Sequence, residues 1–386
     1  MRRLIILLEI CSAFALGREV TVPADECGKT LGCYFGGGSI DDIDTFLCTH
    51  MFYGYAGFGE DISIRILEPF DYAQGKAYID VKGLQQKNKE LKILVPVGDK
   101  YDNFRNISNN DIPYSVLTDP DVREKLVNNI VNFVKESGFN GIDLDLTNPP
   151  QNGGRPSDKE NIVLLLKALR EEFDKEGLIL SALADPSEKT VKLLYDIEGI
   201  SKYVSFINLK TFDFHGMLDA DKKLGHSSPL YHSSEENEED RKKNVDSIVK
   251  QWISEGAPSV KLIIGIAFYG RSYTLASSEK IGRGAKFAHE GKCGSSPEYY
   301  NLCPLLKNKD WKRIYDKEQK VPYMYNGTEV VTYDDEESIK TKAEYVMNTN
   351  LGGAMAWTAN QDDFHGKCGE KFPLLKTLKS VLRNKC

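Results

Sequence analysis

A single stretch of the sequence says most about the fold: residues 139–147 read FNGIDLDLT. Acidic and apolar side chains alternate along it, and a period of two is typical of a β-strand, whose successive side chains point to opposite faces. Asp143, Asp145 and Thr147 therefore share one face, and the apolar residues between them share the other. The acidic face points either into a protein interior or into solvent. Helical patterns flank the strand and would cover its apolar face, which favours the interior, where two adjacent carboxylates must be compensated.

Strand patterns alternate with helical patterns along most of the chain, which is typical of βαβ units and a parallel sheet. One helical pattern begins at Pro120 and ends at Gly138, and another begins with a capping-box motif from Ser157 to Glu160. Eight strands that continue to the C-terminus favour a closed (β/α)8 TIM barrel over an open doubly wound sheet. The candidate strands are residues 30–34, 49–53, 92–97, 141–146, 178–183, 204–209, 261–268 and 353–357.

The regular alternation stops between the seventh and eighth candidate strands. This segment contains strand patterns of its own, and Asn326-Gly327 fits a tight hairpin turn between two of them. We interpret it as a small α+β insertion on the rim of the barrel. The predicted organisation is a signal peptide at 1–17, barrel strands 1 to 7 at 18–276, the α+β insertion domain at 277–335, and the eighth strand with a C-terminal helix at 336–386.

The first residues predict the compartment of the protein. Arg2 and Arg3 precede an apolar run at residues 4–16, and small residues follow at its end. This order is typical of a secretory signal peptide, and the run is too short to span a bilayer; a buried N-terminal helix is the alternative interpretation. We therefore expect a secreted, extracellular protein without membrane insertion. The net charge of −7 argues against nucleic acid as the main partner.

The cysteines and sequons agree with secretion. The chain has eight cysteines, and Cys11 lies in the predicted signal peptide. An odd number therefore remains, so at least one thiol is free or pairs with another chain. Their wide spacing lacks the paired short loops of a zinc site, so we expect disulfides and no metal or organic cofactor. Asn106 and Asn326 begin N-x-S/T sequons and are predicted glycosylation sites.

The stretch 139–147 resembles the D-G-x-D-x-D-x-E signature of glycoside hydrolase family 18, the chitinases and chitinase-like proteins. Further blocks similar to those of the family are residues 33–35, 46–53, 207–216, 261–275 and 351–364. The resemblance covers nearly the whole mature chain and implies a TIM barrel with an insertion before the eighth strand. Members of this family cleave β-1,4-linked N-acetylglucosamine by a substrate-assisted route, in which a Glu at the last motif position protonates the leaving oxygen.

The sequence departs from the family at the positions that carry catalysis. Thr147 stands where the family has the catalytic Glu, and a hydroxyl without useful acidity cannot replace a carboxylic acid as proton donor. Asn140 replaces the first motif Asp, Lys210 replaces the sixth-strand Met, and Phe212 replaces the Tyr that helps to hold the acetamido group. Aromatic platforms expected on the first and third strands are also lost. The degenerate catalytic site comprises Asn140, Asp143, Asp145, Thr147, Lys210, Phe212 and Asp213.

The resemblance also implies which residues still bind a ligand. Trp357 matches the platform beneath the central sugar, and a plain core tryptophan is the alternative interpretation. Asp213 and Arg271 could equally form a structural ion pair. The candidate ligand-binding residues are Tyr34, Phe52, Asp145, Asp213, Tyr269, Arg271 and Trp357. Bridges of the family imply the disulfides Cys33–Cys48 and Cys303–Cys368, and leave Cys27, Cys293 and Cys386 unassigned.

Lys210 shares its strand face with Phe212 and, by the resemblance, projects toward the centre of the barrel. A buried ammonium is costly without a partner, and Asp143 and Asp145 crowd negative charge into the same space. We therefore predict an ion pair between Lys210 and Asp145. In the alternative interpretation, Lys210 lies on the outer face among the helices.

Three functions are compatible with the sequence. The one we favour is a secreted, non-catalytic chitinase-like protein of the lectin or imaginal disc growth factor-like branch, which binds chitin, chitooligosaccharide or related glycans, or an extracellular protein partner. The second is a family 18 chitinase with weak or altered activity that uses another acid, such as Asp145 or Asp213. The third is a structural or storage role on an inert barrel.

Overall fold

The computed structural model describes residues 28–35, 44–58, 62–66, 83–98, 119–147 and 157–384. The predicted signal peptide, Cys27, Cys386, Asn106 and the first-strand platform at residues 36–38 lie outside these residues. Within them, none of the helices has the length and apolar character that a membrane span needs.

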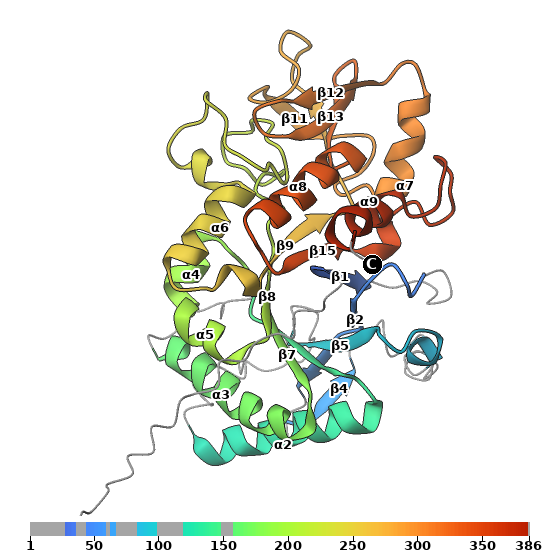
Figure 1. The fold of residues 1–386 in the computed structure, drawn as a ribbon. Coiled ribbons are helices and arrows are strands. Elements are labelled where there is room, and N and C mark those ends of the chain that lie inside the picture. The colour runs from blue at the N-terminus through green and yellow to red at the C-terminus, as the bar shows by residue number, and fades with distance from the viewer. Residues whose placement is uncertain are drawn as a thin grey trace, which may run out of the picture.

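Eight parallel strands form a closed barrel, as the sequence predicts (Figure 1). The strands are β1 (Thr30–Phe35), β2 (His50–Tyr53), β5 (Lys92–Val97), β6 (Gly141–Asp145), β7 (Ile179–Ala184), β8 (Phe206–Leu209), β9 (Leu262–Ala267) and β15 (Gly353–Trp357). The barrel closes because β1 pairs with β15 on one side and with β2 on the other, and β2 pairs with β5. A short antiparallel hairpin, β3 (Ala56–Phe58) and β4 (Ile64–Ile66), extends the sheet beside β5 and was not predicted.

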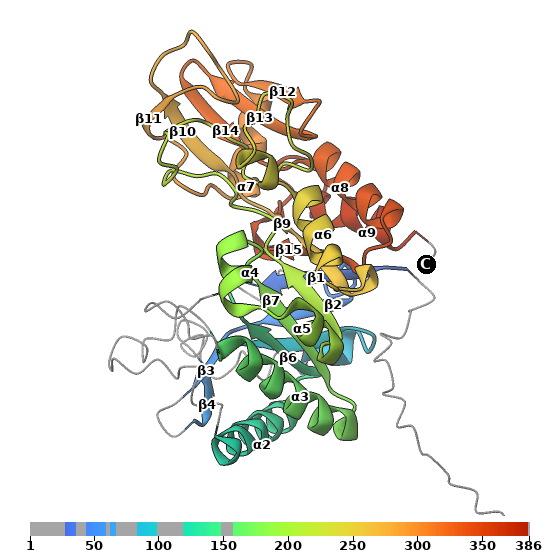
Figure 2. The same ribbon diagram turned by 90° about the vertical axis from the view of Figure 1, so that its left-hand side faces the viewer.

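Helices cover the outer face of the barrel (Figures 1 and 2). The α-helices that follow barrel strands or close the chain are α2 (Pro120–Ser137), α3 (Asp158–Glu176), α4 (Glu188–Leu194), α5 (Ile197–Tyr203), α6 (Val245–Ser254), α8 (Glu336–Asn348) and α9 (Pro373–Leu382). Short 3-10 turns are η4 (Asp240–Lys242), η5 (Ser259–Lys261), η6 (Cys303–Lys307) and η7 (Ala359–Gln361).

The predicted signals at the helix ends are partly confirmed. Helix α2 begins at Pro120, and Gly138 caps its C-terminal end with a φ of 78°, the left-handed conformation that glycine adopts readily. Helix α3 begins next to Ser157 as predicted, but the capping box is wrong: the Ser157 side chain makes no capping hydrogen bond. The backbone of Ser157 is helical, with φ of −71° and ψ of −15°, whereas a capping serine usually has an extended backbone.

A second sheet lies between β9 and β15 in the sequence and extends beyond one end of the barrel (Figure 2). Its antiparallel strands are β10 (Arg271–Leu275), β11 (Phe287–Glu290), β12 (Lys312–Asp316), β13 (Val321–Asn326) and β14 (Glu329–Thr332), with the short helix α7 (Tyr299–Leu302) beside it. The hairpin between β13 and β14 turns at Gly327, which has the predicted positive φ, here 59°. The sheet includes β10, whose residues precede the expected start of the insertion at residue 277.

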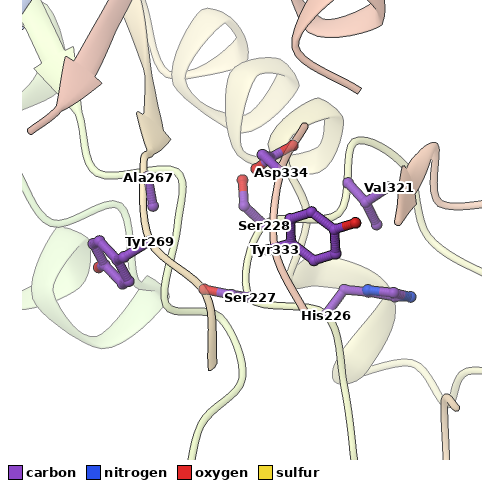
Figure 3. A pocket seen from close by; sticks show the side chains of 8 residues that line it. All are labelled: His226, Ser227, Ser228, Ala267, Tyr269, Val321, Tyr333 and Asp334. Atoms are coloured by element: carbon purple, nitrogen blue, oxygen red, sulfur yellow. The ribbon is translucent and has the colours of Figure 1, made fainter. Parts of the chain in front are cut away.

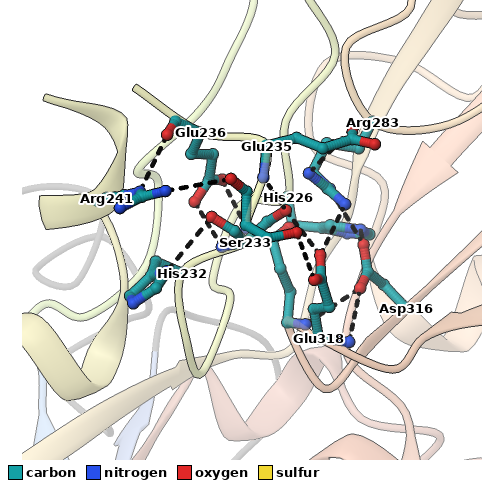
Figure 4. A network of polar contacts seen from close by, with 11 residues as sticks. His226, His232, Ser233, Glu235, Glu236, Arg241, Arg283, Asp316 and Glu318 are labelled. Atoms are coloured by element: carbon teal, nitrogen blue, oxygen red, sulfur yellow. Dashed lines mark hydrogen bonds and ion pairs between the residues drawn. The ribbon is translucent and has the colours of Figure 1, made fainter. Parts of the chain in front are cut away.

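The segment between β8 and α6 is tied to this second sheet by a polar network (Figure 4). Ser233 and Ser234 each donate a hydrogen bond of 2.7 Å to the carboxylate of Glu318, which lies in the turn between β12 and β13. Arg283 contacts Glu318 and Asp316, each at 3.2 Å. These contacts hold the segment after β8, which begins with Lys210, against the insertion.

The contacts of the side chains on the two faces of β6 show which way its carboxylates point. Ile142 and Leu144 belong to the large apolar cluster between strands and helices. Asp143, in contrast, is fully buried and receives a hydrogen bond from Tyr34 of β1, a strand that does not neighbour β6. The acidic face therefore points into the barrel, and the alternative of a solvated surface strand is wrong.

Candidate functional site

Asp143 is the centre of a buried polar cluster inside the barrel. Its carboxylate accepts hydrogen bonds from the Tyr34 hydroxyl, from Ser181 Oγ at 2.5 Å and from Asn208 Nδ2 at 3.1 Å. Burial raises the pKa of Asp143 to about 7, because removal from water disfavours the charged form, although the hydrogen bonds from Ser181 and Tyr34 oppose this effect. Burial and the neighbouring Asp143 likewise raise the pKa of Tyr34. The compensation that the sequence demands for this carboxyl thus comes from neutral donors.

Asp145 is hydrogen-bonded by Thr147, two residues further along the chain. Its Oδ1 atom accepts a 2.8 Å hydrogen bond from the Thr147 backbone N–H and a 2.6 Å hydrogen bond from the Thr147 hydroxyl. Asp145 is buried and Thr147 is half-buried. The Thr147 hydroxyl therefore donates a hydrogen bond to a carboxylate of its own chain.

Asn140, predicted as part of the degenerate catalytic site, lies at the opposite end of β6. Its Oδ1 atom accepts hydrogen bonds from the Ile93 N–H at 2.8 Å and from Gln85 Nε2 at 2.9 Å. The first bond joins the start of β6 to β5, and the second joins it to the helical residues 83–87. Asn140 therefore holds neighbouring segments together and does not lie with Asp143 and Asp145 in one site.

Aromatic rings line the barrel interior beside the acidic cluster. The ring of Tyr34 stacks on Phe52, with centroids 4.3 Å apart, and lies 4.6 Å from Trp357. Phe212 lies 5.7 Å from Trp357 and 6.3 Å from Tyr269. Trp357 stays half-buried while the other four rings are buried. Trp357 is therefore the member of this group that offers ring surface to a ligand.

Lys210 points to these rings, so the alternative in which it lies among the outer helices is wrong. Its ammonium is 5.3 Å from the centroid of the Trp357 ring and 5.8 Å from that of Phe212. The predicted ion pair with Asp145 is also wrong: among the described residues, the Lys210 ammonium forms no ion pair and instead makes these two cation–π contacts. The reason is that Thr147 hydrogen-bonds the Asp145 carboxylate, and aromatic faces attract the ammonium instead.

Asp213, Tyr269 and Arg271 form a compact group at the rim. Arg271 donates from Nε at 3.0 Å and from Nη2 at 2.5 Å to Asp213 Oδ1, and the Tyr269 hydroxyl donates to Asp213 Oδ2 at 2.8 Å. The guanidinium also lies over the Tyr269 ring, 5.1 Å from its centroid. Both carboxylate oxygens of Asp213 are engaged, so the structural ion pair considered from the sequence is formed.

A small cavity lies behind this group, between the barrel and the insertion (Figure 3). Its lining includes Ala267 and Tyr269 from one side and Tyr333 and Asp334 from the other. The cavity has a volume of about 10 Å³, which is room for about one water molecule. A sugar ring does not fit there, so the cavity is separate from any glycan site.

The predicted disulfides Cys33–Cys48 and Cys303–Cys368 are both formed. Cys293 is free and half-buried, and burial raises the pKa of its thiol. Among the described residues, one group has the spacing of metal ligands, Cys303, Asp363 and Cys368. Its two cysteines are bonded to each other, so neither offers a thiolate to a metal.

Ser181 and Asn208 were missed in the sequence. Both are fully buried polar residues in strands that are otherwise apolar, and both bind Asp143. Asn208 lies two residues before Lys210, so strand periodicity places the two on one face. That shared face was the signal that could have found it.

A closed barrel whose fourth strand directs two aspartates inward, beside a tryptophan at the end of its eighth strand, defines a class of glycosidase-like barrel proteins. The model of the family "Glycosyl hydrolases family 18" matches residues 30–362, and the chain belongs to this family. Chitotriosidase-1 of Mus musculus is 33% identical over 351 residues, which are 88% of this chain and 73% of that protein. Probable chitinase 10 of Drosophila melanogaster is 32% identical, but the match spans only 17% of its length.

Solved structures agree with this assignment. A group IV chitinase of Ostrinia furnacalis superposes with a TM-score of 0.82 at 31% identity, covering 92% of this chain and 99% of that one. Human YKL-39, described as a pseudo-chitinase with retained chitooligosaccharide binding properties, superposes with a TM-score of 0.80 at 30% identity and with the same coverage. The family therefore includes both chitinases and a pseudo-chitinase of this fold.

Proposed function

We propose that this protein is a secreted, non-catalytic member of family 18 that binds chitooligosaccharides or related glycans. The observation that carries the proposal is the Thr147 hydroxyl, which stands at the position of the family's proton donor and is hydrogen-bonded to Asp145 at 2.6 Å. General acid catalysis is typically worth about 10²–10⁴-fold in rate, and a threonine hydroxyl has no useful acidity near neutral pH.

The other carboxyl groups of the site are poorly arranged to take over this role. Asp143 can hold a proton near neutral pH, because its pKa is raised to about 7, but it is fully buried and surrounded by three hydrogen-bond donors. Asp213 would have to leave its ion pair with Arg271 before it could transfer a proton. Both observations support a protein that does not hydrolyse glycosidic bonds.

Glycan binding is supported by the exposed part of Trp357 and by the similarity to YKL-39. A partly exposed indole is a common platform for a pyranose ring, because the apolar face of the sugar packs on the aromatic surface. Secretion is supported by the order of residues at the N-terminus and by the two disulfides. An extracellular protein partner is the alternative to a glycan.

The absence of catalysis is tested with a fluorogenic chitobioside, assayed from acidic to mildly alkaline pH beside an active chitinase of the family. We expect no turnover above background. Turnover that follows the protein through purification and is abolished in Asp145→Ala would contradict the proposal and favour the altered chitinase.

Glycan binding is tested by calorimetric titration with N-acetylchitooligosaccharides of increasing length. We expect saturable binding that Trp357→Ala weakens about 5- to 150-fold, because stacking on an aromatic ring is worth about 1–3 kcal/mol by analogy with base stacking. Trp311→Ala is the matched control, because Trp311 is also half-buried but lies just before β12 in the insertion. Equal affinities of the two variants would show that the barrel site is not where the sugar binds.

A further inference from the structure

The Lys210 ammonium places a positive charge beside two aromatic rings of the site, those of Trp357 and Phe212. Lys210 follows β8 directly, is half-buried, and has its ammonium within 6 Å of the ring centroids of both Trp357 and Phe212. Among the residues that the structure describes, it forms neither an ion pair nor a side-chain hydrogen bond. Within the part of the chain that the structure describes, a cation therefore lies beside the half-buried tryptophan without an anionic partner.

The two aspartates of β6 accept hydrogen bonds from groups other than Lys210. Asp143 takes hydrogen bonds from Tyr34, Ser181 and Asn208, and Asp145 takes them from Thr147. The groups that donate these hydrogen bonds are neutral, and Lys210 takes part in none of them.

The cation–π contacts compensate Lys210 only in part. Such contacts are weaker than a hydrogen-bonded ion pair, whereas a half-buried ammonium has lost part of its interactions with water. An anionic group of a ligand that reached the Trp357 ring would supply the acceptor and the opposite charge at once. A neutral methionine, which the family resemblance places at this position, could not favour such a ligand.

We propose that the site selects glycans with an anionic substituent, a carboxylate or a sulfate, which pairs with Lys210 while a sugar ring packs on Trp357. This inference rests on the proposed function, because it assumes that the barrel site binds a glycan. It adds the class of glycan: acidic oligosaccharides bind more tightly than neutral chitooligosaccharides of the same length.

The test compares three probes of equal length by calorimetry: a neutral N-acetylchitooligosaccharide, an oligosaccharide of alternating N-acetylglucosamine and glucuronate, and an O-sulfated chitooligosaccharide. The wild-type protein is expected to bind at least one acidic probe about tenfold or more tightly than the neutral one, as a hydrogen bond between charged groups allows. Preference for the glucuronate probe alone identifies a carboxylate ligand, and preference for the sulfated probe alone identifies a sulfate ligand. The preference should weaken as salt concentration rises.

Two variants decide whether Lys210 is responsible. Lys210→Met should lose the preference for acidic probes, and circular dichroism should show an unchanged fold. Lys312→Met is the matched control: Lys312 has a comparable cation–π contact, 5.9 Å from the Tyr325 centroid, but lies on β12 of the insertion. This control should keep the preference.

Three outcomes would overturn the inference. Equal affinity of the wild-type protein for neutral and acidic probes would refute it while leaving the proposed function intact. The same conclusion would follow if Lys210→Met kept the preference, because the acidic probes would then bind other surface cations. If no probe of either kind bound to the wild-type protein or to Lys210→Met, the proposed glycan binding would fail together with the inference.

Discussion

Replacement of Asp143 by asparagine should change how the stability of the protein depends on pH. The carboxyl of Asp143 is fully buried, and burial raises its pKa from 3.8 to about 7. The folded protein therefore binds this proton more tightly than the unfolded chain does. The contribution of this group to the free energy of unfolding is fully present below pH 3.8 and is lost as the pH rises through about 7.

The size of the effect follows from the shift. About three pKa units at 1.36 kcal/mol each correspond to about 4 kcal/mol, which the wild-type protein loses across this pH window because of Asp143. Asparagine does not titrate, so Asp143→Asn should lose less stability than the wild-type protein between acidic and mildly alkaline pH. An amide can still bond to Tyr34, Ser181 and Asn208, because the two hydroxyl groups can also accept hydrogen bonds.

The assay is urea unfolding followed by circular dichroism at pH 5 and at pH 8, with the free energy of unfolding compared between the two. Asp310→Asn is the control for the loss of one carboxylate, because Asp310 lies exposed in the turn before β12. If Asp143→Asn loses as much stability between the two pH values as the wild-type protein does, the raised pKa of Asp143 is not a property of the folded state.

Two further predictions concern other polar groups of the barrel. Thr147→Glu should give little or no chitinase activity on a fluorogenic chitobioside, because Lys210 and Phe212 still differ from the residues of the family at their positions. Robust turnover by this variant would contradict the prediction. Lys342→Met should lower the free energy of unfolding by about 3–5 kcal/mol, because it leaves Asp334 buried without its partner; the two groups are 2.7 Å apart and almost fully buried. The double variant Lys342→Met, Asp334→Leu should recover part of this loss in urea unfolding, and equal stability of the single and double variants would contradict the buried-charge explanation.

The barrel could be predicted from sequence because each strand repeats a pattern with a physical period. Strand alternation placed Asp143 and Asp145 on one face, and the apolar residues between them required a helix layer on the other. The interior position of Asp143 followed from this geometry and is confirmed. Strand periodicity likewise placed Lys210 on one face with Phe212, whose ring its ammonium contacts, whereas its direction toward the barrel interior was implied by the family resemblance.

The hydrogen-bond partners inside the barrel could not be predicted in the same way. Ser181 reaches Asp143 from the neighbouring strand β7, and Asn208 reaches it from β8, one strand further round the barrel. Such contacts depend on the register of the whole barrel. Lys210 has a long flexible side chain, so its face was predictable but its partner was not. Thr147 supplied the competing hydrogen bond that the ion-pair prediction did not consider.

The central claim is that this barrel binds a glycan and leaves it intact. The most direct test is a calorimetric titration with an N-acetylglucosamine-containing oligosaccharide, followed by mass spectrometry of the sugar recovered from the cell. We predict saturable binding and a recovered oligosaccharide of unchanged length. Shorter products that are absent when Asp145→Ala is titrated in the same way would contradict the claim.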